Sequence, residues 1–415
     1  MTTPATLRVM AALAAKGAVL RFVGGCVRDA LLDLPVKDID IATPDPPEKT
    51  LALLQSAGVR AIPTGIDHGT VTAIADGTRY EITTLRIDVE PQGRRARVAF
   101  TDDWEADAAR RDFTINALSA SADGRVYDPF DGIADLRAGR VRFVGDPQIR
   151  IREDVLRLVR FFRFYAYYGR PPPDAPSIVA CQALAHLVPG LSGERIWGEM
   201  AKLLLADNAA SVLALMKDLG VLQQIVPEAS DIGRLAALVQ IEVRRAAPDA
   251  QRRLAAMLPE DRFAVSALAV RLRLSNEGRA RLVGLAAPDQ LPSVATDTKS
   301  ARRMLYRQGA DRFRDLVLLA EASGMARDPD GAERDAAAFD RLLAEADRWV
   351  PLTLPVGGSD VLASGIAAGP EVGRLLAAVE RWWEEGDFTA GRKECLGRLA
   401  ELAARGAEGR PTSPA

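Results

Sequence analysis

Residues 18–40 read AVLRFVGGCVRDALLDLPVKDID, and this stretch decides the fold of the N-terminal part of the chain. The apolar run Ala18–Val23 predicts a strand, and a pair of glycines stands between it and a predicted helix. Glycines at such a turn let the backbone approach an anion closely, with the amides of the helix N-terminus facing it. We therefore expect Gly24 and Gly25 to contact a phosphate group. Arg28, one turn into the helix, adds a fixed positive charge.

Two aspartates, Asp38 and Asp40, lie two positions apart on the next predicted strand. The strand period of two places both carboxylates on one face. Two such oxygen ligands suit Mg²⁺, which binds one or two carboxylates together with substrate phosphates. Glu81, on a later strand, is a candidate third carboxylate. A lone Asp-x-Asp is more often an exposed strand edge, but the phosphate-binding turn upstream favours a two-metal site for nucleotidyl transfer.

Strand and helix signals mix over the first 140 residues. A helix is predicted at Pro47–Ala57. The apolar runs Thr70–Ala75 and Arg79–Arg86 flank Asp76-Gly77, a strong signal for an antiparallel hairpin. From about residue 150 the strand signals fade, and segments of helical periodicity alternate with prolines and glycines. The sequence therefore predicts an α+β N-terminal unit followed by an all-helical remainder.

Composition limits the kind of protein. A chain of 415 residues exceeds what one hydrophobic core holds, and 48% hydrophobic with 27% charged residues is typical of a soluble globular protein. The net charge of −2 does not indicate a polyanionic partner, so any nucleic-acid binding must come from local clusters of arginine. The three cysteines are far apart in no metal-ligand spacing, which fits a reducing cytoplasm. No apolar stretch is long enough to span a membrane, and the N-terminus does not resemble a signal peptide.

Four charged residues recur every three positions on a helix predicted at Glu153–Tyr168, namely Asp154, Arg157, Arg160 and Arg163. On one helix they would form a slanted ridge about 13 Å long at ~1.5 Å per residue, comparable with the length of a nucleotide. A solvated charged face is the alternative. The residues between them are large and apolar, however, so we expect a buried helix whose charges need partners.

The residue types on this ridge suggest how it would select a base. Asp154 can accept a hydrogen bond from the exocyclic amine of cytosine or adenine, and Arg157 can donate one to the adjacent ring nitrogen. Guanine and uracil would leave both groups unpaired, a loss that can discriminate by ~10⁴. Arg160 and Arg163 are then expected to hold the triphosphate.

Five segments, taken in order, resemble the motifs of the class II tRNA nucleotidyltransferases, which are the CCA-adding enzymes and bacterial poly(A) polymerases of the DNA polymerase beta superfamily. They are Gly24–Asp29 with Asp38–Asp40, Arg110–Ala117, Asp128–Leu136, Glu153–Arg157 and Glu194–Glu199. The resemblance implies a catalytic head at residues 1–140 with a mixed sheet. It also implies an all-α neck at 141–205 for base selection, a body at 206–330 for RNA binding and a tail at 331–415 for tRNA binding. A disordered end is expected after Arg405.

By the same resemblance, the substrates are CTP and ATP, the cofactor is Mg²⁺ and the partner is the acceptor arm and 3′ end of tRNA. Arg111 is expected to contact the nucleotide, and Asp112 to brace its loop. The chain lacks the G-R-R-F-x-L-V-H-V-like stretch of bacterial poly(A) polymerases and carries a full-length loop at Asp88–Thr101, so CCA addition is favoured. Poly(A) addition, addition of CC only and a catalytically idle RNA-binding protein remain alternatives. The sequence indicates no oligomeric state.

Overall fold

The computed structural model describes residues 1–90 and 97–408. These residues form two compact units, one made of residues 1–232 and 248–280 and the other of residues 233–247 and 281–415. The tip of the loop predicted to complete the final A, residues 91–96, lies outside the described residues, as does the chain beyond residue 408. The expected disorder after Arg405 is wrong at its start, because the last helix continues to Glu408. No helix in the described ranges has the length and apolar character needed to cross a membrane.

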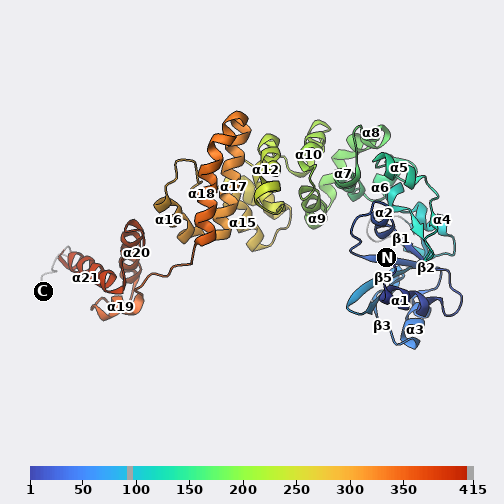
Figure 1. Cartoon of the computed structure of the whole chain (residues 1–415), viewed down its shortest axis with the longest axis horizontal. Helices are drawn as coiled ribbons and strands as arrows, with labels where there is room; N and C mark the ends of the chain where they lie inside the picture. Colours follow the sequence, from blue (N-terminus) through green and yellow to red (C-terminus); the bar gives the residue numbers. More distant parts are fainter. Residues whose placement is uncertain (91–96, 409–415) are drawn as a thin grey trace. The chain divides into compact units, whose positions relative to one another are not determined.

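The first unit is built on a seven-stranded mixed sheet in the order β3-β4-β5-β2-β1-β8-β9 (Figure 1). Only β2 and β5 pair in parallel, and the other neighbours are antiparallel. The strands are β1 (Arg21–Val23), β2 (Ile39–Thr43), β3 (Arg60–Gly65), β4 (Thr70–Ala75), β5 (Thr78–Thr84), β8 (Ser119–Ala120) and β9 (Val126–Tyr127). A separate two-stranded ribbon joins β6 (Arg86–Glu90) to β7 (Arg97–Phe100).

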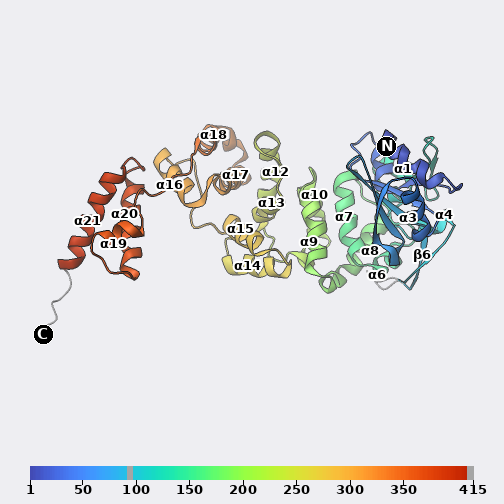
Figure 2. The same ribbon diagram turned by 90° about the horizontal axis from the view of Figure 1, so that it is seen from below.

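The predicted hairpin is confirmed, since β4 and β5 pair from Ala75 and Thr78 outward. Asp76 and Gly77 both have positive φ, which a two-residue hairpin turn of the type favoured by Asp-Gly requires. Side chains alternate along these strands, so Val71 and the other buried residues lie on one face. The helices α1 (Pro4–Ala14) and α3 (Pro47–Ser56) cover that face (Figure 1 and Figure 2). The opposite face of β3, β4 and β5, called the open face below, carries the half-buried Thr72 and the exposed Arg79 and Glu81 among the described residues.

Helices make up the rest of the first unit. Those that frame the sheet are α2 (Gly25–Leu31), α4 (Trp104–Ala109) and α5 (Gly132–Ala138). They are followed by α6 (Pro147–Glu153), α7 (Leu156–Tyr168), α8 (Ala175–Leu184), α9 (Gly193–Leu204), α10 (Ala209–Asp218), α11 (Leu222–Ile225), α13 (Ala250–Met257) and α14 (Arg262–Arg271), while α15 (Asn276–Ala286) crosses the boundary between the units. No strand occurs beyond residue 150 among the described residues, as the sequence predicts.

An aromatic core ties the sheet region to α7. Phe113, Phe143 and Phe161 are each at most 1% exposed, and the rings of Phe113 and Phe143 lie 4.9 Å apart between centroids. Phe161 stacks on Phe143 at 5.8 Å. Burying aromatic side chains of this size is strongly stabilising, so α7 is held firmly against the residues that follow α4. This packing fixes the position of the charged side chains on α7.

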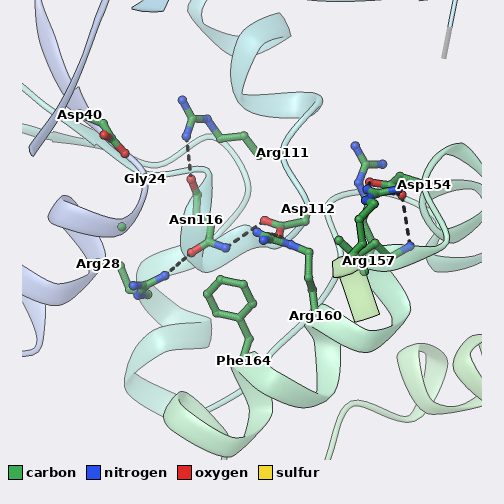
Figure 3. A pocket seen from close by; sticks show the side chains of 13 residues that line it. Gly24, Arg28, Asp40, Arg111, Asp112, Asn116, Asp154, Arg157, Arg160 and Phe164 are labelled. Atoms are coloured by element: carbon green, nitrogen blue, oxygen red, sulfur yellow. Dashed lines mark hydrogen bonds and ion pairs between the residues drawn. The ribbon is translucent and has the colours of Figure 1, made fainter. Parts of the chain in front are cut away.

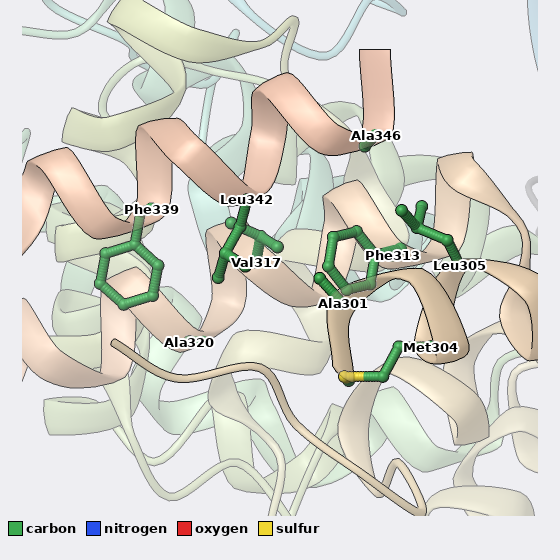
Figure 4. Packing of buried hydrophobic residues seen from close by; sticks show 9 residues of the cluster. All are labelled: Ala301, Met304, Leu305, Phe313, Val317, Ala320, Phe339, Leu342 and Ala346. Carbon is green, nitrogen blue, oxygen red and sulfur yellow. The ribbon is translucent and has the colours of Figure 1, made fainter. Parts of the chain in front are cut away.

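The second unit is all-helical among the described residues. Its helices are α12 (Ile232–Arg245), α16 (Thr298–Gln308), α17 (Ala310–Arg327), α18 (Ala332–Arg348), α19 (Gly358–Ala363), α20 (Pro370–Glu385) and α21 (Arg392–Glu408). Apolar side chains of α16, α17 and α18 interlock around Phe313 and Leu342, both fully buried (Figure 4). A further cluster joins α19, α20 and α21 around Val379 and Cys395. The unit therefore has hydrophobic cores of its own.

Candidate active site

The turn after β1 brings the backbone close to an open space. Gly24 has φ of 70° and caps α2, and a Cβ built on it would lie 2.9 Å from Nη1 of Arg111. A side chain at this position would therefore strain the backbone and displace that arginine. Arg28, in α2, is 7% exposed, and Nη1 of its guanidinium donates to Oδ1 of Asn116 at 2.5 Å. Gly24, Gly25 and Arg28 line one cavity, and their contact with a phosphate stays a prediction.

Three carboxylates, from Asp38, Asp40 and Glu81, line one cavity of about 340 Å³ on the open face of the sheet. Asp38 directly precedes β2, and Asp40 lies within it opposite Glu81 of the parallel strand β5. Burial raises the pKa of Asp40 to about 6, and the neighbouring charges of Glu81 and Asp38 act in the same direction against that of Arg111. Like charges held together in a partly buried place create a site where a bound cation would be stabilised.

The carboxylates of this cavity fit a magnesium ion that takes only part of its ligands from the protein. Among the described residues, no three or more acidic, histidine or cysteine side chains converge closely enough to hold a metal by themselves. Mg²⁺ does not need such a cage, because it commonly takes one or two protein carboxylates and completes its shell with water and substrate phosphates. We expect Asp38 and Asp40 to supply those carboxylates. Direct ligation by Glu81 stays a prediction.

A larger cavity, of about 550 Å³, adjoins the glycine turn and shares Asp40 with the first (Figure 3). Most of the residues expected to bind the nucleotide line it, namely Gly24, Gly25, Arg28, Arg111, Asp154, Arg157 and Arg160. The sequence analysis named no nucleotide contact for Asp112, Asn116, Leu156, Phe164 or Arg195, which also line it. Figure 3 shows the glycine turn at one end of the cavity and Asp154 with Arg157 at the other.

A chain of hydrogen bonds runs along the floor of this cavity. Nδ2 of Asn116 donates to Oδ1 of Asp112 at 2.9 Å, and Nε of Arg160 donates to Oδ2 of the same carboxylate at 2.9 Å. Burial alone would raise the pKa of Asp112, but the charge of Arg160 and the hydrogen bonds hold it below its usual range. The ring of Phe164 lies between two guanidiniums, 5.3 Å from the central carbon of Arg28 and 5.3 Å from that of Arg160. Asp112 thus braces its loop, as expected.

The predicted ridge is wrong at its first member. Asp154 has an extended backbone (φ −149°, ψ 104°) at the break between α6 and α7, so it does not share a helix with the three arginines. Its carboxylate is instead held by Arg195 of α9, whose Nη2 donates to both oxygens at 3.0 and 2.8 Å. Arg157, in the first turn of α7, donates from Nη1 to Oε2 of Glu153 at 2.5 Å. The two groups expected to read the base, Asp154 and Arg157, lie at one end of the cavity, each with an internal partner.

Arg163 is not among the residues that line the cavity. Its Nε donates to Oε2 of Glu199, and its guanidinium carbon lies 4.1 Å from the ring centroid of Phe164. Glu199 also accepts a bond from Arg160, so it links two turns of α7 to α9. The expected grip of Arg163 on a triphosphate therefore has no support in this geometry. The sequence analysis gave no role to Asn116, Arg195 or Glu199. All three lie inside the segments that resemble family motifs, and this location is the signal that could have identified them.

Comparison with protein families gives two matches. Residues 20–142 match the model of the poly A polymerase head domain. Residues 176–232 match the model described as the probable RNA and SrmB-binding site of polymerase A. The first match spans the strands of the sheet, including those that line the two cavities. The second match spans most of α8 and all of α9, α10 and α11, which follow α7.

Curated relatives match nearly the whole chain. The CCA tRNA nucleotidyltransferase 1, mitochondrial, of Danio rerio is 34% identical over 391 residues, which are 92% of this chain and 87% of the relative. The CCA-adding enzyme of Limosilactobacillus fermentum is 34% identical over 386 residues, 92% of each chain.

Solved structures share the fold. The crystal structure of Bacillus stearothermophilus CCA-adding enzyme in complex with CTP is similar with a TM-score of 0.77 at 27% identity, covering 99% of this chain and 100% of that one. The Thermotoga maritima CCA-adding enzyme complexed with tRNA is similar in fold, with a TM-score of 0.63 at 19% identity over 97% of this chain and 96% of that one.

Proposed function

The chain belongs to the family of the CCA-adding tRNA nucleotidyltransferases, and from that premise we propose that it adds CMP, CMP and AMP to the 3′ end of tRNA. CTP and ATP are the donors, pyrophosphate leaves and no nucleic-acid template is used. One observation supports the proposal most directly. The glycine turn, Asp40 and the pair Asp154 and Arg157 surround one cavity, so phosphate binding, metal binding and base reading occur in one place (Figure 3).

Enzymes of this kind typically use divalent metal ions, and we propose Mg²⁺ held by Asp38 and Asp40. When bound, such ions lower the pKa of the attacking hydroxyl and stabilise the charge on the leaving pyrophosphate. The protein's own groups orient the donor. Backbone amides after Gly24 face its phosphates, and the guanidiniums of Arg28 and Arg111 neutralise them.

Base selection rests on the partners of Asp154 and Arg157. Arg195 donates to both oxygens of Asp154, so the carboxylate is held in one orientation and presents its oxygens as acceptors. An acceptor beside a donor matches the edge of cytosine and adenine and mismatches that of uracil and guanine. The guanidinium of Arg157 is held by Glu153 through Nη1 and by the carbonyl of Arg110 through Nη2, which limits the positions that its remaining donors can reach. Protein side chains thereby replace a template.

The acceptor needs a place from which its 3′-hydroxyl can reach the donor. We assign the sheet-face cavity to the last nucleotide of the tRNA, since Asp40 lies where this cavity meets the nucleotide cavity. Its walls carry the exposed guanidinium of Arg79 and the hydroxyls of Thr64 and Thr72, which share a hydrogen bond of 2.9 Å. These groups suit a ribose-phosphate terminus.

The test is a product-length assay with tRNA that lacks its CCA end, Mg²⁺ and labelled CTP and ATP. We expect extension by three nucleotides, and none when a chelator removes the metal. Extension by two would indicate CC addition, and no extension of the tRNA would overturn the proposal.

Poly(A) addition is the second candidate, because both matching family models carry the name of that polymerase. It predicts long homopolymers from ATP on generic RNA, which the same gel distinguishes. A catalytically idle RNA-binding protein would give no product with either substrate.

We further propose that the four predicted segments divide the work, with the head (1–140) and neck (141–205) holding every residue that lines the nucleotide cavity. The body (206–330) and tail (331–415) would bind the acceptor arm. All three cysteines are buried and free, which fits the cytoplasm as the place of action.

A further inference from the structure

The head contains a third hollow, of about 440 Å³, whose lining shares no residue with the two cavities described above. It forms where α4 approaches β1, β8 and β9. Arg21 opens the three-residue strand β1, whereas the phosphate-binding Gly24 follows its other end. The hollow is therefore separated from the nucleotide cavity by the length of a strand, and nothing in the proposed reaction uses it.

Two aromatic rings hold the guanidinium of Arg21 in this hollow. Its central carbon lies 3.5 Å from the ring centroid of Tyr127 and 4.1 Å from that of Trp104, both well inside the range of cation–π attraction. Its Nε is buried and has no hydrogen-bond partner. The rings hold the planar group in place but do not satisfy its donors, which need an acceptor.

A second guanidinium, that of Arg125, lies over the same ring, with its central carbon 5.0 Å from the ring centroid of Tyr127. Burial lowers the pKa of Arg21, and the charge of Arg125 lowers it further, against an opposing effect of Tyr127. Within the described ranges, neither arginine side chain forms an ion pair with a carboxylate. Two like charges thus share one wall, and the exposed carboxylate of Asp123 acts on Arg125 only through space while it accepts the backbone amide of that residue.

The acidic side chains on this wall do not cancel that charge. Asp128 uses both carboxylate oxygens to accept the amides of Gly132 and Ile133, at 2.7 and 2.9 Å, at the start of α5. Glu105 is exposed and forms no ion pair within the described residues. Ser119 adds a hydroxyl to the lining.

We propose that this hollow binds a phosphate group through Arg21 and Arg125. A guanidinium presents its donors in a fork that matches two phosphate oxygens, and an anion placed between two such groups relieves their repulsion. The phosphate belongs either to an RNA backbone or to free phosphate or pyrophosphate. The chemistry is the same for both sources, and the experiment separates them.

The test uses the full chain with two variants, Arg21→Gln and Arg125→Gln, and a matched control, Arg137→Gln, which removes an exposed charge from α5 outside the three cavities. Because Arg125 is exposed, its variant keeps the test valid even if Arg21→Gln perturbs the fold. Trp104 reports on free anions, and Trp104→Phe shows which part of the fluorescence signal belongs to it.

If free anions bind, inorganic phosphate or pyrophosphate changes the Trp104 fluorescence saturably, and each arginine variant weakens the apparent affinity by about tenfold while the control does not. If RNA binds, the free anions have no such effect. The slope of log affinity for tRNA against log salt then falls by about one in each variant and not in the control. A fluorescence response and a salt slope that both match the unmodified protein in Arg21→Gln and Arg125→Gln would overturn the proposal.

Discussion

Asp40 lines both the nucleotide cavity and the sheet-face cavity, so its carboxylate stands between the proposed places of the donor and the acceptor. Replacing it with asparagine keeps the shape and removes the charge. We expect turnover to fall by on the order of 10³-fold or more, because stabilisation of phosphoryl charge by a metal is worth several kcal/mol. The unfolding midpoint without metal should not fall, since the pKa of Asp40 is raised and its charge is a cost to the fold. Turnover and urea unfolding, measured on the same preparation, check the two expectations. Substantial activity of the variant would show that Asp40 does not bind the metal.

We expect base choice to depend on Arg195. This residue is not expected to contact the sugar or the phosphates of the nucleotide. In Arg195→Met the carboxylate of Asp154 loses the two hydrogen bonds from Arg195 and keeps only the one that the amide of Leu156 donates to Oδ1. We expect the preference for CTP over UTP to fall by about tenfold or more, since a mismatched base then meets a group that can rotate away. The measurement is kcat/KM for each nucleotide with the same tRNA.

Arg271→Met is the matched control, because it breaks an ion pair with Glu228 in the same unit (2.7 Å) at a place that lines no nucleotide cavity. Equal losses with CTP and UTP in Arg195→Met would show that Arg195 supports the fold and not the selection.

At the level of elements, α7 is the helix that joins the proposed phosphate end of the cavity to the proposed base end. Its apolar side packs on the aromatic core, and its arginines reach Asp112 on one side and Glu199 on the other. Buried charges of this kind are stable only in pairs. The ion pairs with Asp112 and Glu199 therefore set the register between α7, α9 and the loop that follows α4.

The pair of Asp112 and Arg160 makes this junction dependent on pH. Because the pKa of Asp112 is held low in the folded state, its contribution to stability is present above the ordinary carboxyl range and is lost as pH falls through the folded pKa. Asp112→Asn should cost about 3–5 kcal/mol at neutral pH, the usual result of breaking a buried ion pair. That cost should shrink as pH falls below about 4, because the carboxyl of the unfolded chain then binds a proton that the native carboxyl, with its lowered pKa, does not yet bind. Urea unfolding from pH 7 to pH 3 measures it, and a cost independent of pH would contradict this account.

The same elements show what could be predicted from sequence and what could not. Asp40 could be placed because a strand alternates its side chains regardless of its neighbours, and Asp38, predicted on the same strand, lies one residue before it and lines the same cavity. Asp154 was misplaced because its spacing to Arg157 fits a helix, whereas the chain leaves the helix at that residue to meet Arg195. Arg163 points to Glu199 for a similar reason. Partners that lie some 40 positions apart in the chain decide these side chains, and periodicity carries no information about them.

For the whole molecule, the decisive feature is that the chain crosses between its two units more than once. The helix α12 belongs to the second unit, although residues on both sides of it belong to the first. Each unit has buried clusters of its own, such as the one around Phe313 in the second. A cut at any single position between residues 232 and 280 would remove part of a core, so the body cannot be trimmed cleanly from the catalytic half.

This division predicts how ligand binding affects stability. Every residue that lines the nucleotide cavity belongs to the first unit, so CTP with Mg²⁺ should stabilise that unit alone. A ligand at 100 times its dissociation constant adds about 2.7 kcal/mol to the unit that binds it. Trp104 and Trp197 lie in the first unit, while Trp349, Trp382 and Trp383 lie in the second, so phenylalanine substitutions in either set separate the two fluorescence signals. We expect CTP to move the urea midpoint of the first signal and leave the second in place, and GTP to move neither. If both midpoints move together, the crossings couple the two units into one cooperative structure, and base selection at Asp154 is then felt along the whole chain.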